Sequence, residues 1–165
     1  MMTKVLDKVF LDDLLNQAQG HPRLRQNFDM RTSPNDSSQR MLNALLPETE
    51  VPVHRHPNSS ENVICLTGRI DEVIYEETKE AIPVPGGFEQ GMDAQDMSYR
   101  TVLREKERIH LCPAEGNYGC IVPAGAWHTV EVFEPSVIYE AKDGKYGADG
   151  STFCDYPIAE DSSAT

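Results

Sequence analysis

The sequence predicts an all-β fold: a small jelly-roll barrel made of two antiparallel sheets, with one helix at its N-terminal end. From about residue 39 onward, short apolar and β-branched runs alternate with turns rich in Pro, Gly, Asn and Ser, whereas helical spacing of apolar residues is confined to the start of the chain. The length of 165 residues, with 39% hydrophobic and 25% charged residues, fits one ordinary globular domain. We therefore expect a single domain over residues 1–165, with an arm over 1–40, a barrel over 41–146 and a tail over 147–165.

The helix is predicted over residues 7–20. Its apolar residues recur at the three- and four-residue spacing that places them on one face of a helix, and they are Phe10, Leu11, Leu14, Leu15 and Ala18. Gly20 and then Pro22 provide a stop. We expect this helix to cover the outside of a sheet.

Seven short strands are predicted for the barrel, at residues 40–46, 62–67, 70–76, 109–112, 118–122, 127–133 and 136–141. Gly68 and Arg69 are expected to form a tight hairpin turn between the second and the third. If Glu61 faces inward, period-two alternation places Val63 and Cys65 beside it and leaves an apolar opposite face. A helix or a partner subunit is expected on that opposite face.

Residues 78–108 interrupt this alternation of short strands and turns. The segment 83–91 is rich in Pro and Gly, residues 92–97 carry no clear period, and a strand is expected to resume over 99–104. We expect a loop-like insertion here, either a peripheral excursion or a lid over the site.

The stretch from residue 52 to 68 carries the residues that indicate chemistry. On a strand, His54 and His56 point to the same face, and the turn after them allows Glu61 to open the next strand close by. His128 follows a Pro/Gly turn at the start of another strand. Three imidazoles and one carboxylate suit one divalent transition ion, such as iron, manganese, nickel, cobalt, copper or zinc.

These two stretches read H-x-H-x4-E-x6-G and P-x-G-x2-H, and they resemble the two motifs of the cupin family. The resemblance implies a double-stranded β-helix barrel in which His54, His56, Glu61 and His128 are the metal ligands. Because cupin barrels commonly pair, it also implies a homodimer.

A narrower resemblance is to the WbuC-type cupin-fold metalloproteins, over residues 6 to 146. It is carried by the residues at positions 22–25, 27, 39–40, 52, 54–57, 127–128, 140, 142, 144 and 146. Relative to the shorter members of that family, residues 78–108 look like an insertion. The family is associated by name with bacterial surface-polysaccharide gene clusters, which suggests a sugar-derived substrate.

The metal and the pocket around it define three functional hypotheses. In the first, the ion is a Lewis acid for isomerisation or epimerisation of a small sugar derivative, with Arg23, Arg25 and Arg69 as candidates for binding an anionic group and Glu140 or Tyr139 for proton transfer. The second is an iron-dependent dioxygenase. The third is a metal-stabilised sugar-binding or regulatory cupin without turnover, and a barrel with an unused metal site is a further alternative.

Charge, hydropathy and cysteine spacing argue against several other classes of protein. The formal net charge of −12 disfavours nucleic acid and anionic membrane surfaces as partners. No apolar run is long enough to span a bilayer, and the start lacks the pattern of a secretory signal, so we expect a cytoplasmic protein. The four cysteines have no metal or disulfide spacing and are expected to be free thiols.

Overall fold

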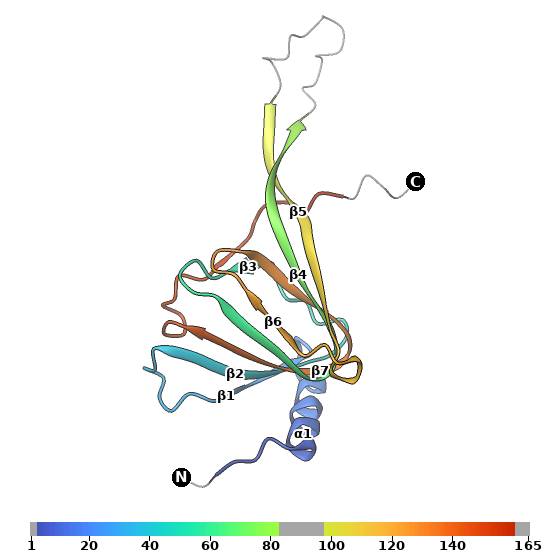
Figure 1. Ribbon diagram of the computed structural model, residues 1–165, viewed down its shortest axis with the longest axis vertical. Helices are drawn as coiled ribbons and strands as arrows, with labels where there is room; N and C mark the ends of the chain where they lie inside the picture. Colours follow the sequence, from blue (N-terminus) through green and yellow to red (C-terminus); the bar gives the residue numbers. More distant parts are fainter. Residues whose placement is uncertain (1–2, 83–97, 161–165) are drawn as a thin grey trace, which may run out of the picture.

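The computed structural model describes residues 3–82 and 98–160 and shows a mostly β protein with one N-terminal helix (Figure 1). All pairings between its named strands are antiparallel, which confirms the predicted fold class. The elements are α1 (Lys8–Gln19), β1 (Arg25–Asp29), β2 (Ser38–Leu45), β3 (His54–Arg55), β4 (Glu61–Ile82), β5 (Ser98–Leu111), the 3-10 turn η3 (Pro113–Glu115), β6 (Gly119–Val122), β7 (Trp127–Asp143) and β8 (Thr152–Phe153). Within the described ranges, no helix has the length and apolarity that a membrane crossing requires.

Two long strands, β4 and β7, organise the sheet. They pair along most of β7, from Glu61 opposite Lys142 to Tyr75 opposite Trp127. The second half of β7 also pairs with β2, while its first half pairs with β3 through His54 and His128. Because different strands flank the two halves, β4 and β7 each belong to two layers, with the interior between them.

The predicted hairpin at Gly68 and Arg69 is wrong, because the chain bends there without leaving β7. Gly68 has a φ of +95°, and a Cβ at this position would lie 2.1 Å from the Ser136 Oγ. The Ser136 hydroxyl accepts a hydrogen bond from the Arg69 N–H at 3.0 Å. The left-handed glycine therefore makes an irregular corner in a continuous strand, and the opposing segments predicted at 127–133 and 136–141 are likewise one strand, β7.

The strand expected to resume over 99–104 is present as part of β5, and the rest of the insertion predicted over 78–108 is also strand in its described parts. β4 continues to Ile82 and β5 begins at Ser98, so that the two form a long hairpin that rises away from the barrel, with residues 83–97 outside the described part (Figure 1). A cross-strand ion pair between Arg100 and Glu80, at 2.7 Å, supports these arms. The arms are largely polar and exposed here, which explains why no period-two pattern predicted them.

The helix lies where it was predicted. The Asp7 side chain caps its start by accepting a hydrogen bond from the Phe10 N–H at 2.9 Å, and Gly20 caps its end. Leu14 and Ala18 pack with Leu42 and other apolar side chains from the outer face of β2 and β7. The helix thus covers the outside of one layer.

Trp127 on β7 packs against the C-terminal segment. It packs with Val73, Tyr75 and Leu103 in a separate cluster, and its ring centroid lies 6.4 Å from that of Tyr156. The backbone of residues 157–159 bonds to Leu103 on β5. The predicted tail is therefore in part a structural element.

The interior between the layers is apolar except for a few carboxyl groups. Val63, Cys65, Ile70, Ile74 and Val130 share the main core, as the predicted alternation along β4 requires. Glu72 lies on the same inward face of β4 and is 0% exposed, and neither of its carboxyl oxygens has a hydrogen-bond partner in the described structure. Burial, followed by repulsion from Glu61 and Glu140, raises the pKa of Glu72 well above its ordinary value.

We predict that Glu72→Met stabilises the protein at pH 7 by about 1–3 kcal/mol, because it removes a buried polar group that has no partner. At pH values below the ordinary pKa of the carboxyl, folded and unfolded chains are both protonated at Glu72. As pH rises, only the unfolded chain releases the proton, so wild-type stability falls and the advantage of the variant grows.

Urea unfolding from pH 4 to pH 8 measures this difference, with Glu107→Gln on the exposed surface of β5 as the control. A Glu72→Met variant that is less stable than the wild type at pH 7 would contradict the assignment of Glu72 as an unpartnered carboxyl.

Candidate metal centre

Three histidines predicted as ligands come together at one point of the barrel. His54 on β3 is paired in register with His128 on β7, and His56 follows two residues later with its side chain on the same side. One ligand atom from each of the three residues lies within 4.8 Å of the others, and the rings of His54 and His128 are 4.3 Å apart. His56 and His128 are buried. This cluster has the composition and compactness to hold a metal ion.

Hydrogen bonds fix the tautomers of two of these imidazoles. The Nδ1 of His54 lies 2.9 Å from the Pro52 carbonyl oxygen, and the Nδ1 of His128 lies 2.9 Å from that of Ala126. A carbonyl oxygen can only accept, so each Nδ1 carries the proton and each Nε2 presents a lone pair. The buried Nε2 of His128 has no hydrogen-bond partner in the described structure, so its lone pair is available to a metal ion.

Residues near the C-terminus determine the tautomer of the third imidazole, that of His56. The Ser151 hydroxyl donates to the Asp149 carboxylate at 2.6 Å, so its oxygen is left to accept from the His56 Nδ1, also at 2.6 Å. Burial opposes ionisation of Asp149, but hydrogen bonds from Ser151 and Gln39 lower its pKa below the ordinary value. His56 therefore also presents Nε2 to the centre of the cluster.

Glu61, the predicted fourth ligand, borders the cluster without being part of the compact set. Its Oε2 lies 3.0 Å from the His56 Nε2, and its Oε1 lies 3.7 Å from the His128 Nε2. Burial alone would raise its pKa, but contacts with His128, His56 and Lys142 hold the pKa well below its usual range. Glu61 is therefore a carboxylate at the edge of the three histidines.

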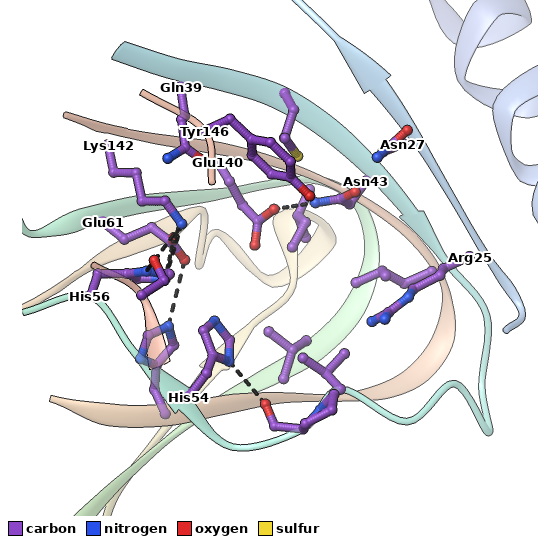
Figure 2. A pocket seen from close by; sticks show the side chains of 18 of the residues that line it. Arg25, Asn27, Gln39, Asn43, His54, His56, Glu61, Glu140, Lys142 and Tyr146 are labelled. Atoms are coloured by element: carbon purple, nitrogen blue, oxygen red, sulfur yellow. Dashed lines mark hydrogen bonds and ion pairs between the residues drawn. The ribbon is translucent and has the colours of Figure 1, made fainter. Parts of the chain in front are cut away.

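Lys142 supplies the positive charge between Glu61 and His56. Its Nζ lies 3.2 Å from the Glu61 Oε2 and 3.1 Å from the His56 Nε2 (Figure 2). Two acceptor atoms that face each other at 3.0 Å require a proton or a cation beside them, because both carry lone pairs. The separation also fits neighbouring ligands of one ion, since two atoms at about 2.1 Å from a metal and at right angles are about 3.0 Å apart.

The interior environment keeps His54 neutral. Burial, followed by the proximity of His128, lowers its pKa to about 4. A neutral imidazole is the form that binds metal. The donor set thus fits a divalent transition ion in both tautomer and charge.

The histidines form part of the wall of a cavity of about 600 Å³. Residues of β1, β2, β4 and β7, the segments 21–23 and 51–52, and the segment 146–153 make the rest of the wall. A volume of this size falls within the range of sites for small molecules, about 300–1,000 Å³. Figure 2 shows Arg25 entering the pocket from the side opposite to Lys142 and His56.

The pocket includes some of the predicted substrate-binding residues and excludes others. Arg23 and Arg25 line it, as predicted. Arg69 lies elsewhere, in ion pairs with Glu115 at 3.2 Å and Glu134 at 3.4 Å. The structure therefore does not bring Arg69 together with the histidines, and its guanidinium is held by the carboxylates of Glu115 and Glu134.

Glu140 and Tyr139 are likewise separated by strand alternation. Glu140 lines the pocket and accepts a hydrogen bond from the Asn43 side chain. Burial, followed by the charge of Glu61, raises the pKa of Glu140 to about 8. Tyr139 lies on the opposite face, where it packs against the helix cluster, so its predicted role in proton transfer is not supported by its position.

The sequence did not indicate Asp149, Ser151 or the contact of Lys142 with Glu61. Asp149 and Ser151 lie in a segment without periodicity, within the predicted tail. Lys142 could have been predicted to face the pocket, because it lies two residues from Glu140 on the same face of β7. Its pairing with Glu61 could not, because it depends on the β4–β7 register.

The family model that matches this chain is described as a domain of unknown function (DUF6016), and it matches residues 6–83, just under half of the chain. The matched part contains His54, His56 and Glu61 but not His128. No curated protein matches the sequence.

Solved structures similar to this one include TT1209 from Thermus thermophilus, at 20% identity over 86% of this chain and 98% of that chain, with a TM-score of 0.49. KdgF from a Halomonas species is similar at 13% identity over 75% of this chain and 82% of that chain, with a TM-score of 0.43. Bacillus subtilis oxalate decarboxylase, whose description names Mn(II) centres, is similar at 17% identity over 78% of this chain, with a TM-score of 0.44.

The chain spans only 27% to 31% of the length of the oxalate decarboxylases it matches. Identities and TM-scores of this size do not transfer a function. The fold assignment rests on the strand order and pairing described above.

We predict that protein purified without added metal or a histidine tag contains a stoichiometric transition metal, and that His54→Ala and His128→Ala each abolish its retention. Each substitution removes one of three converging Nε2 ligands. Elemental analysis measures the outcome. His110→Ala is the matched control, since His110 contacts Asp71 and Glu115 away from the cluster and its loss should leave the metal content unchanged.

We also predict that Ser151→Ala weakens metal affinity by about 10–100-fold, because it releases the His56 Nδ1 from the hydrogen bond that fixes its tautomer. Competition with a chromophoric chelator measures the affinity, and Ser33→Ala, in a surface turn, is the control. Equal affinities for wild type and Ser151→Ala would show that Ser151 does not orient the ligand.

Proposed function

We propose that this chain is a cupin-type metalloprotein that acts on a small, oxygen-rich, sugar-derived molecule in the manner of an isomerase or epimerase. The observation that carries the proposal is the convergence of three imidazoles, each presenting Nε2 to the cluster, in the wall of a cavity that Glu140 also lines. A built metal-ligand set and a titratable carboxyl in one pocket are typical of an active site.

His54, His56 and His128 would hold the ion, and we propose that Glu61 completes the ligand set with Lys142 displaced toward Asp149. Lys142 already lies 3.7 Å from the Asp149 Oδ2, so a partner for its charge is at hand. Nitrogen and carboxylate donors suit iron, manganese, nickel or zinc. When bound, such an ion polarises a carbonyl or hydroxyl group of the substrate as a Lewis acid.

Glu140 is the group that we propose moves the proton. With a pKa of about 8, it holds a proton near neutral pH and exchanges it readily, which suits a general acid or base. Asn43 fixes the orientation of its carboxyl group. Val130 and Ile138 add apolar surface to the pocket wall.

An iron-dependent dioxygenase is the second candidate, because the same three histidines and the neighbouring carboxylate are also suitable ligands for iron. A non-catalytic sugar-binding or regulatory protein would use the same ion to hold its ligand. The WbuC-type assignment, the link to polysaccharide synthesis, the homodimer and the cytoplasmic location remain predictions from the sequence.

The proposed proton transfer is tested by exchange of substrate protons with deuterated solvent. Metal-loaded protein is incubated in D₂O with a panel of aldoses, ketoses and sugar acids, and NMR follows deuterium incorporation next to the carbonyl carbon. We expect incorporation with at least one sugar, and we expect Glu140→Gln to slow it by about 10²–10⁴-fold without loss of metal. Glu107→Gln, on the exposed face of β5, should react at the wild-type rate.

The alternatives give different results in the same samples. Oxygen consumption that requires iron and a sugar, without deuterium incorporation, would replace the isomerase proposal with the dioxygenase. Saturable sugar binding with neither oxygen consumption nor deuterium incorporation would indicate the binding protein.

A further inference from the structure

Arg25 is an unusual arginine for so acidic a chain. The sequence has 27 acidic and 15 basic residues, and most guanidinium groups find a carboxylate, as Arg31 does with Asp29 at 2.7 Å and Arg100 does with Glu80. Arg25 is half-buried, yet over residues 3–82 and 98–160 its side chain makes no ion pair or hydrogen bond. A partly desolvated guanidinium without a partner indicates a ligand that supplies the acceptor.

The strands around Arg25 explain why no carboxylate meets it. Its register partner on β2 is Leu45, and Asn27 and Asn43 are paired directly opposite one another in the next inward-facing row. Asp29, four residues further along β1 on the same face, is held by Arg31 and does not line the pocket. Glu140 on β7 does line it, but already accepts a hydrogen bond from Asn43. The residues of β1 and β2 that line the pocket thus include one cation and four amides, but no anion.

The charge balance of the pocket supports the same conclusion. Its lining contains three basic residues and three acidic ones, in a protein whose net charge is −12. The bases are Arg23, Arg25 and Lys142, and the acids are Glu61, Glu140 and Asp149. A divalent ion at the histidines would leave the pocket positive, and the high pKa of Glu140 adds to this excess. A neutral ligand would leave that charge uncompensated.

We propose that the ligand of this pocket carries an anionic group, a carboxylate or a phosphate, that binds to the Arg25 guanidinium while its other oxygens reach the metal end. Asn27 and Asn43, which also line the pocket, suit hydroxyl groups. The inference rests on the proposed function for the metal end, but the anion subsite belongs to β1 and is independent of the histidines.

The experiment measures binding of three probes: glucuronate for a carboxylate, glucose 6-phosphate for a phosphate, and neutral glucose. Isothermal titration is performed with metal-loaded and metal-free protein. We expect at least one anionic probe to bind more tightly than glucose, and Arg25→Gln to weaken that binding by about 10–100-fold. Arg25→Lys should restore part of the affinity, because lysine supplies the positive charge but not the planar guanidinium that binds an anion through two parallel hydrogen bonds.

Arg104→Gln is the control for net charge, since Arg104 is exposed on β5 and lies outside the pocket lining, and it should change affinity less than twofold. The preferred anionic probe distinguishes a carboxylate from a phosphate. If neither anionic probe binds at millimolar concentration, or if Arg25→Gln binds them as the wild type does, the inference is overturned.

Metal content, measured on the same samples, separates this inference from the proposed function. Protein that holds no metal but binds an anion through Arg25 would refute the metal centre and support the subsite. Protein that retains metal but binds the anionic probes equally well with and without Arg25 would support the metal centre and refute the anion subsite.

Discussion

The antiparallel pairing of β4 with β7 is the constraint on which the rest of the molecule depends. It fixes Glu61 opposite Lys142 at one end and Ile74 opposite His128 nearer the other, with the corner at Gly68 between them. Because each strand passes from one layer to the other, this pairing positions both the carboxylate side and the histidine side of the site, with a register shift at the corner. A slip of one residue would turn these side chains out of the pocket.

The histidine cluster and the helix were predictable because their signals are local. His54 and His56 share a face through the two-residue period of a strand, and the helix has a cap, an apolar stripe and a stop. The supports of the site depend on contacts far apart in sequence. The bond of Ser151 to His56 spans 95 residues, and the contact of Lys142 with Glu61 spans 81, so no spacing rule reveals them.

The interior combines apolar packing with an unfavourable concentration of negative charge. The charges of Glu61 and Glu140 raise the pKa of Glu72, and the charge of Glu61 raises that of Glu140. Lys142 compensates only part of this repulsion. A bound cation would offset more of it, so metal binding and folding stability should be thermodynamically linked in this protein.

The outer edge of β5 limits how the sheet can grow. β5 pairs with β4 alone among the described strands, and residues 104–108 are five consecutive exposed charges, REKER. A strand from another molecule that docked there would have to remove water from all five. The hairpin that projects from the barrel is thereby protected against edge-to-edge aggregation, even though much of its backbone is open on that side.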